Sequence, residues 1–264
     1  MLRNDHGAGT GTPPAPHAEA HVRSSAVLSL VPPVGRPGSS GSEVARKLQL
    51  VLDSLPSLAR DAEHLRNVAV VHLLFSTGLL PIEVAGLTVG DYLDSTGNVR
   101  SISGVRPEVA FNRRSRPLLF VNENLVEAVD AYLDRRVLKV APRARGLYGG
   151  LDPESRLILG DLGKPFRIQH QSGLDGRRSC RGFAKLCARL FAVAKKKYGI
   201  HPAAGRRLLA RELYREGADP KALQTLFGLS TQKKLVGLIQ AELSHDDRLE
   251  AAMRGLARML RTFR

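Results

Sequence analysis

Residues 75–91, with the sequence FSTGLLPIEVAGLTVGD, constrain the fold more than any other stretch of this chain. An apolar helical pattern runs into this stretch and is interrupted at Gly78, because glycine readily adopts the left-handed conformation that ends many helices. Pro81 follows at a favoured first helical position, where its missing N–H would be unpaired anyway. The stretch therefore predicts a tight turn between one helix and a short second helix over 81–87.

Apolar residues at helical spacing dominate the chain beyond residue 42. They predict further helices over 43–55, 58–75, 123–136, 183–194 and 244–260. Residues 92–121 differ, because short extended runs broken by Gly, Asn and Pro predict a small antiparallel sheet whose turn carries NRRSR. The segment RLILGD (156–161) is expected to add one short strand. The predicted fold class is mostly α with a small antiparallel β-sheet (α+β).

The positive charge of the chain belongs to its folded part. Residues 1–42, rich in Gly, Pro, Ala and Ser, are expected to form a disordered tail, and residues 43–264 a single domain. The tail contributes +1 to the formal net charge of +15, from three arginines against two acids, which leaves +14 on the domain. Such a charge is typical of proteins that bind a polyanion, and nucleic acid is the first candidate.

The sequence also disfavours several classes of protein. It has no apolar run of the roughly 18 residues that a membrane span needs, and no secretory signal, so we expect a cytoplasmic, nucleoid-associated protein. The two cysteines, Cys180 and Cys187, fall on one face of a predicted helix and indicate packed thiols rather than a disulfide or a metal site. We expect no metal and no cofactor.

Positive charge is concentrated in residues 163–211, which hold 13 Lys and Arg and one acidic residue, Asp175. An apolar stripe in the helix over 183–194 leaves Arg181, Lys185 and Arg189 together on another face. A solvated surface would explain this row equally well by itself. Together with the neighbouring GRR and KKK runs, the row favours a surface that follows DNA phosphates.

The turn at Gly78 resembles the first motif of the catalytic domain of the tyrosine recombinases, the phage-integrase family. In that family a TGLR turn is followed, three residues after its arginine, by a glutamate, and then by a leucine and an aspartate at intervals of four. Leu80 stands here in the place of the arginine. The residues that fit the spacing are Thr77, Gly78, Leu79, Glu83, Leu87 and Asp91.

A second stretch resembles the family's PHxLRH helix and the two spaced glycines and histidine that follow it. Pro202, Arg206, Gly217 and Gly228 match this pattern. The departures are Ala203 for the first histidine, Arg207 for the second-box histidine or lysine, Leu229 for the histidine after the second glycine, and Leu238 for the tyrosine nucleophile. The resemblance covers about residues 58–240.

The family also carries a lysine on the hairpin of its small sheet, and the corresponding turn at 111–116 offers only arginines. An arginine there keeps the charge but is a poor proton donor, because its guanidinium stays protonated. The helical core-binding domain that usually precedes the catalytic domain has no match in this sequence.

The resemblance implies a DNA-binding fold whose cutting groups are replaced. In the family, arginines and histidine or lysine donors stabilise the charge on the phosphate that the tyrosine attacks. Because Leu80, Ala203, Leu229 and Leu238 replace four such groups, we expect no cleavage by that mechanism and a former pocket filled with apolar side chains. Arg206 stays in register, and the resemblance places it near a DNA phosphate; the alternative is an arginine that is solvated at the start of a helix.

We therefore expect a pseudo-enzyme that binds duplex DNA as a transcriptional regulator, or as an accessory factor of a mobile element or plasmid. The candidate DNA-binding residues are Arg113, Arg114, Arg116, Lys164, Arg177, Arg178, Arg181, Lys185, Lys195, Lys196, Lys197, Arg206 and Arg207.

Two alternatives stay open. The first is an enzyme, either a recombinase with a displaced nucleophile or another phosphoryl-transfer activity, for which Tyr198 and Tyr214 are the only nearby phenols. The second is a partner-binding module, in which the amphipathic segment 244–264 packs into a neighbouring subunit to give a homo-oligomer, as the family's C-terminal helices do. The apolar stripe of that segment is equally well explained as core.

Overall fold

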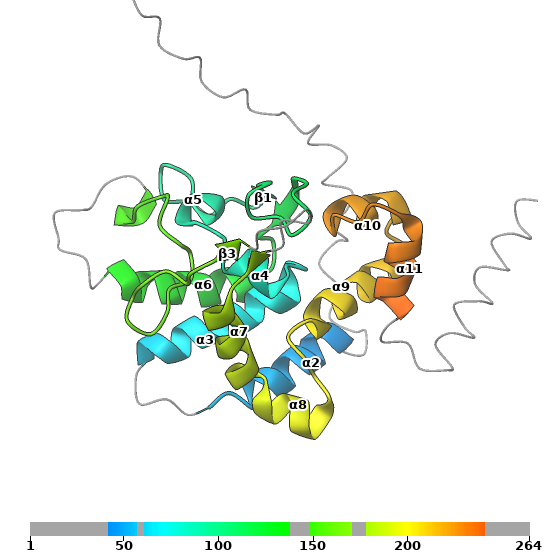
Figure 1. Ribbon diagram of the computed structural model, residues 1–264, viewed down its shortest axis with the longest axis horizontal. Helices are drawn as coiled ribbons and strands as arrows, with labels where there is room; N and C mark the ends of the chain where they lie inside the picture. The colour runs from blue at the N-terminus through cyan, green and yellow to red at the C-terminus, as the bar shows by residue number, and fades with distance from the viewer. Residues whose placement is uncertain (1–41, 57–60, 138–147, 171–177, 241–264) are drawn as a thin grey trace, which may run out of the picture.

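The computed structural model describes residues 42–56, 61–137, 148–170 and 178–240. Most of them are helical, and the strands form two small antiparallel sheets, β1 with β2 and β3 with β4, which confirms the predicted α+β class (Figure 1). The helices are α2 (Glu43–Leu52), α3 (Asp61–Ser76), α4 (Pro81–Val84), α5 (Val89–Tyr92), α6 (Glu123–Val137), α7 (Arg181–Leu190), α8 (Ala192–Tyr198), α9 (Ala204–Arg215), α10 (Pro220–Leu226) and α11 (Gln232–Gln240), with a 3-10 turn η2 (Tyr148–Gly150). The strands are β1 (Ile102–Val105), β2 (Arg116–Leu119), β3 (Gln169–His170) and β4 (Arg178–Ser179).

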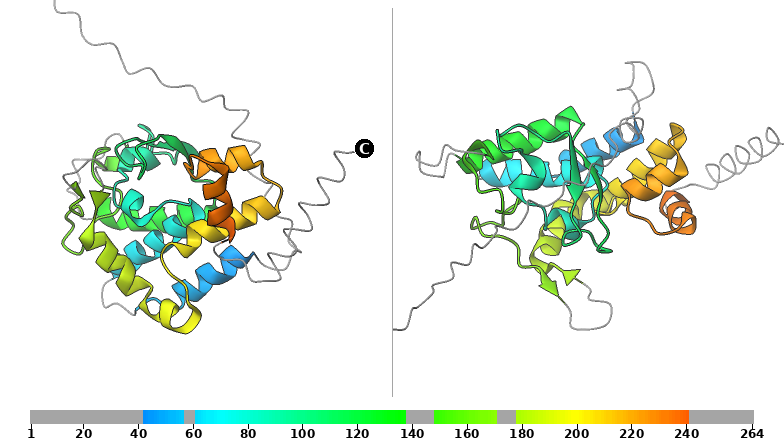
Figure 2. Two further views of the ribbon diagram at one scale, coloured as in Figure 1. Left: turned by 45° about the vertical axis from the view of Figure 1, so that its right-hand side comes forward. Right: turned by 90° about the horizontal axis from the view of Figure 1, so that it is seen from above.

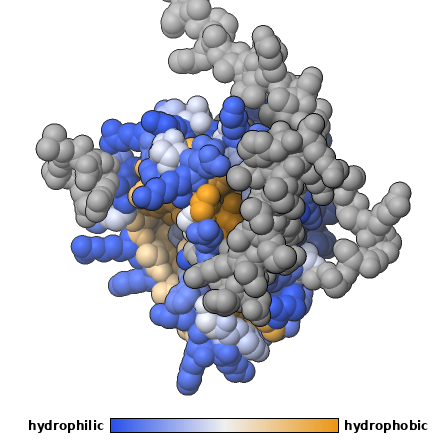
Figure 3. All heavy atoms as spheres, turned by 90° about the vertical axis from the view of Figure 1, so that its right-hand side faces the viewer, coloured by the Kyte–Doolittle hydropathy of each residue, from blue (hydrophilic) through white to orange (hydrophobic). Residues whose placement is uncertain are grey.

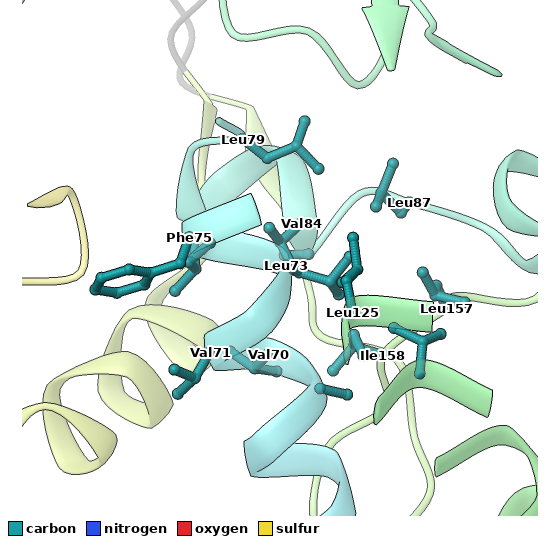
Figure 4. Packing of buried hydrophobic residues seen from close by; sticks show 14 of the residues in the cluster. Val70, Val71, Leu73, Phe75, Leu79, Val84, Leu87, Leu125, Leu157 and Ile158 are labelled. Atoms are coloured by element: carbon teal, nitrogen blue, oxygen red, sulfur yellow. The ribbon is translucent and has the colours of Figure 1, made fainter. Parts of the chain in front are cut away.

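Helix α3 lies at the centre of the hydrophobic core. Its residues from Ala69 to Phe75 are all buried, so this helix has no solvent-facing side along its second half. It packs against α6 and α9, and Figure 4 shows Phe75 and Val71 pointing away from the side on which Leu73 meets Leu125 of α6. The core is therefore built around one helix that is covered from several directions.

The turn between α3 and α4 is as tight as the sequence predicts. Thr77 Oγ1 donates to a carbonyl of α3 over 2.6 Å, and Gly78 adopts a φ of +67°. A Cβ atom on Gly78 would lie 2.5 Å from Cε1 of Phe227, so a larger residue could not occupy this position without strain. At the start of α4, the Glu83 carboxylate accepts the backbone N–H of Leu80 over 2.8 Å and so caps the helix.

Helix α9 crosses α3 at very close range. A Cβ atom on Gly205 would lie 2.5 Å from the carbonyl oxygen of Leu74 and 2.7 Å from Cα of Phe75. Beyond this crossing, α9, α10 and α11 enclose a second hydrophobic cluster that includes Leu223 and Phe227. These three helices lie together at one side of the molecule (Figure 1). Seen from that side, the visible face is mostly hydrophilic, with a smaller hydrophobic area among the hydrophilic residues (Figure 3).

The segment RLILGD does not form the predicted strand. Arg156 and Leu159 make only isolated bridges, to Thr88 and Pro165. The guanidinium of Arg136 donates to the carbonyls of residues 156 and 157, each over 2.8 Å. These carbonyls are therefore bound to a side chain and are not available to a neighbouring strand.

Two further features differ from the sequence-based expectation. The helix predicted over 183–194 is interrupted at Phe191, whose buried ring stacks on that of Phe75 with the ring centres 6.3 Å apart. The sheet of β3 and β4 was not predicted, because two residues per strand are too few for an alternating pattern.

Several predictions concern residues outside the described ranges. These are the tail up to residue 41, Arg177, and the amphipathic segment over 244–264. Ser42, which the prediction placed in the tail, is the N-cap of α2, and its Oγ accepts the N–H of Ala45 over 3.2 Å. Within the described ranges, the helices are all too short or too polar to serve as membrane spans.

Candidate nucleic-acid interface

A buried carboxylate, Glu83, organises the region around the α3–α4 turn. It accepts three hydrogen bonds, from Arg116 Nη2 over 2.5 Å, from the N–H of Leu80 over 2.8 Å and from the N–H of Phe111 over 2.9 Å. The side chains of Glu83 and Arg116 are each 3% exposed, so this ion pair is withdrawn from solvent. Burial lowers the pKa of Arg116, and the charge of Glu83 opposes that shift. Glu83 thus joins α4, the β1–β2 loop and strand β2.

Arg206, the predicted phosphate contact, is buried and donates its hydrogen bonds to the protein backbone. Its side chain donates to the carbonyl of Gly78 over 2.5 Å and to the carbonyl of Phe227, and its guanidinium lies 5.2 Å from the centre of the Phe227 ring. The residue is 8% exposed. Burial, and secondarily the nearby positive charge of Arg116, lower its pKa to about 10. Arg206 therefore holds the α3–α4 turn to the end of α10 rather than lying solvated at the start of α9.

Arg116 fills the space beside Gly228 and leaves one donor unused. A Cβ atom on Gly228 would lie 2.8 Å from Cδ of Arg116, so the arginine stem lies directly against this backbone. Arg116 Nη1 is buried and has no hydrogen-bond partner within the described residues. Buried donors without partners are uncommon in native proteins, and they mark places where strain or an unseen ligand is worth testing.

The β1–β2 loop is fastened from a second direction by Arg178 of β4. Its guanidinium donates to the carbonyls of Val109, over 3.0 Å, and of Ala110. Burial is the largest cause of the lowered pKa of Arg178, and the positive charge of Arg113 adds to it. Both this loop and the strands β3 and β4 lie toward the same side of the molecule in the view from above (Figure 2, right).

Five of the exposed basic candidates lie on three segments near this side. Arg113 and Arg114 lie on the β1–β2 loop, whereas Arg181 and Lys185 lie on the exposed face of α7, as the sequence predicted, and Lys164 lies on the turn before β3. The turn and the helix are in contact, because the rings of residues 166 and 183 pack edge to face at 5.2 Å. The structure thus places exposed cations on three separate segments, of which the turn before β3 and α7 are in contact.

The KKK run lies apart from these three segments. Lys195, Lys196 and Lys197 are exposed on α8, which packs against α2 and α7 and lies at the opposite edge of the molecule from β1 in both Figure 1 and Figure 2 (left). Arg207 is half-buried on α9. The twelve candidates within the described residues therefore do not form one continuous face.

The four apolar replacements occupy different environments. Leu229 and Leu238 are partly buried and pack against the second hydrophobic cluster. Leu80 is half-buried at the N-cap of α4, and Ala203 is half-buried at the N-cap of α9.

A charged cleft that sequence reasoning did not find lies beside strands β3 and β4. Its volume is about 790 Å³, and Arg106, Arg156 and Arg178 are among its lining residues. Arg106 Nε donates to Asp91 over 2.9 Å, and Arg156 donates to the carbonyl of Gly86 over 2.5 Å. The lining comes from separate segments of the chain, so no local pattern could have revealed it. The described residues contain no group of three or more His, Cys, Asp or Glu that could hold a metal ion.

Some known proteins share part of this sequence or its fold. No protein-family model matches the sequence. The chain is 26% identical over 169 residues to the tyrosine recombinase XerD of Halalkalibacterium halodurans, and the match covers 64% of this chain and 47% of that protein. The chain thus spans about half the length of this curated relative.

Two solved structures share the fold. The XerA recombinase superposes with a TM-score of 0.55 at 18% identity, covering 85% of this chain and 66% of that one. The XerH site-specific recombinase, bound to a palindromic difH substrate, superposes with a TM-score of 0.50 at 15% identity, covering 80% of this chain and 50% of that one. At these identities the likeness establishes the architecture.

Proposed function

Because this chain folds as a tyrosine recombinase-like catalytic domain, we propose that it binds duplex DNA without cutting it by the tyrosine route. The observation that carries the proposal is the gathering of exposed cations from the β1–β2 loop, the turn before β3 and helix α7 on one side of the fold. Cations arranged in this way neutralise successive phosphates and release the counterions of the duplex. We propose Arg113, Arg114, Lys164, Arg181 and Lys185 as the principal contacts.

We propose the absence of cleavage because the side chains at the expected catalytic positions lack the groups that the reaction needs. Each preorganised donor removed from a transition state costs about 10² to 10³ in rate, and loss of the nucleophile removes the covalent route. Leu80, Ala203, Leu229 and Leu238 stand where the resemblance expects such groups. Arg206 already donates to two backbone carbonyls, so a phosphate would compete with the protein for its donors.

The phenols offer little support for a displaced nucleophile. Tyr198 lies on α8, at the edge of the molecule opposite β1, and Tyr214 is half-buried against the second hydrophobic cluster. A transcriptional regulator, or an accessory factor of a mobile element or plasmid, is the biological role that we propose for such a protein.

The test of binding is a gel shift over a range of salt concentrations. Neutralising six or more phosphates makes the affinity fall by about 10³ or more between roughly 50 and 200 mM salt. The Arg181→Ala, Lys185→Ala double variant should reduce the salt slope by about 2. Arg135→Ala on α6, an exposed arginine next to Asp134, is the matched control and should leave the slope as it was. Affinity that does not change with salt would contradict the proposal.

The test of inactivity is incubation with a nicked suicide DNA substrate. We expect no covalent protein–DNA adduct, because trapping one requires a nucleophile at the phosphate. An adduct would favour the enzyme alternative. Mapping the DNA bound in the native host would then show whether the sites belong to promoters, to a plasmid or to the ends of a mobile element.

A further inference from the structure

Phe111 is an exposed aromatic ring on the basic β1–β2 loop. It is 55% exposed, whereas the other phenylalanines of the described residues are buried or half-buried. Single exposed apolar residues are common on protein surfaces, so exposure by itself would mean little. What distinguishes Phe111 is the way in which its backbone is held.

The loop on either side of Phe111 is fixed by three elements. The N–H of Phe111 donates to Glu83 of α4 over 2.9 Å, and Asn112 Nδ2 donates to the carbonyl of Gly228, after α10, over 2.5 Å. Arg178 of β4 donates to the carbonyl of Ala110, the residue before the ring. The ring is therefore presented by a preorganised backbone, and inserting it into a ligand would cost little further conformational entropy.

Positive charge flanks the ring on its C-terminal side. Arg113 and Arg114 are exposed, and Arg113 adopts a left-handed φ of 56°, which turns the chain sharply beyond Asn112. An apolar ring next to guanidinium groups matches the chemistry of a duplex, in which stacked bases lie between two rows of phosphates. Side chains of this kind inserted at a base step unstack it and kink the duplex.

We propose that Phe111 is a wedge that inserts between neighbouring base pairs and bends the bound DNA, while Arg113 and Arg114 contact neighbouring phosphates. This inference rests on the proposed function and deepens it, because it assigns a mode of binding and not only an affinity. The buried ion pair of Glu83 and Arg116 holds the backbone of Phe111 in place, because Glu83 accepts the N–H of that residue.

The sequence contains no tryptophan, so the F111W variant places a single indole at the proposed contact. With a duplex of about 30 base pairs of random sequence at low salt, we expect quenching of the indole fluorescence and protection from iodide, because the ring stacks on bases. The matched control is V121W. Val121 is 45% exposed near Glu123 and Glu127, where an acidic surface repels the duplex, and its indole should stay accessible to iodide.

A second measurement tests the bend itself. With the native chain, energy transfer between dyes at the two ends of the duplex should report a bend of about 20–90°. The F111A variant should lose this bend and bind roughly 5- to 150-fold more weakly, while the salt slope persists because no charge is removed. The F111L variant, which keeps an apolar wedge, should retain part of the bend.

The possible results separate the two proposals. If the duplex binds with the expected salt dependence but the indole of F111W stays accessible, or the F111A complex remains bent, the wedge is refuted and the proposed function stands. If no duplex binds, the proposed function fails, and the wedge with it. Protection of the indole by a protein partner or by vesicles, but not by DNA, would likewise overturn the inference.

Discussion

Replacing Glu83 with glutamine should destabilise the fold far more than the same replacement at an exposed glutamate. The carboxylate is 3% exposed and accepts from Arg116, from the N–H of Leu80 and from the N–H of Phe111. Glutamine offers one acceptor oxygen, and its amide group would turn a donor toward at least one of these donors. The change also leaves two buried arginines, Arg116 and Arg206, without a compensating negative charge.

The magnitude follows from the burial of the pair. Removing one partner of a buried ion pair costs about 3–5 kcal/mol. At about 2–4 °C for each kcal/mol in a domain of this size, the melting temperature should fall by roughly 6–20 °C. The measurement is urea denaturation followed by circular dichroism, together with a thermal melt. Glu108→Gln on the same loop is the matched control, because Glu108 is exposed, and it should change stability by less than about 0.5 kcal/mol.

A double variant keeps the reasoning testable if Glu83→Gln fails to fold. Replacing Glu83 and Arg116 together with methionine removes both charges, and such exchanges are often neutral or stabilising. The N–H groups of Leu80 and Phe111 lose their acceptor both in Glu83→Met and in the double variant. The double variant should therefore be more stable than Glu83→Met alone, in which Arg116 is a buried charge without a partner, and a double-mutant cycle should give a coupling energy above about 1 kcal/mol. A loss below about 1 kcal/mol in Glu83→Gln, or strictly additive effects, would refute the view that this pair supports the loop.

Other consequences concern the turn, the histidine in the core and the thiols. Gly78→Ala should cost about 2–5 kcal/mol in urea denaturation, because the methyl group meets Phe227 and the left-handed backbone is strained; a change below about 1 kcal/mol would contradict this. Burial lowers the pKa of His72 below 6.5, so the unfolded state binds more protons as the pH falls. The stability that His72 contributes is complete above pH 6.5 and is lost as the pH falls through its folded pKa. In His72→Gln the midpoint of urea denaturation should therefore change less with pH between about pH 7 and 5 than in the native chain. The same pH dependence in both proteins would show that His72 is not its cause. Burial raises the pKa of Cys187 to about 12 and also raises that of Cys180, so a thiol reagent should label neither in the native state, and rapid labelling would show that the core opens.

The sequence alone determined the helical class, the α3–α4 turn and the exposed row on α7. Each of these rests on local information: glycine tolerates the left-handed backbone at residue 78, proline starts a helix at residue 81, and apolar residues at helical spacing leave Arg181 and Lys185 on the outer face. Glu83 stands at the glutamate position of the family spacing, and in the structure it caps α4 by accepting the N–H of Leu80.

Only the tertiary structure decided which arginines face solvent. Arg113 and Arg116 look alike in the run NRRSR, yet the first is exposed and the second is buried against Glu83. Arg206 looks like a phosphate contact in sequence, but it donates to the carbonyls of Gly78 and Phe227. The physical reason is that the N–H groups of a guanidinium can bind water, phosphate, carboxylate or carbonyl. Which of these an arginine meets depends on residues far away in the chain, and Arg206 and Gly78 are 128 residues apart. Local periodicity records which side of a helix is apolar, but it holds no information on what lies opposite.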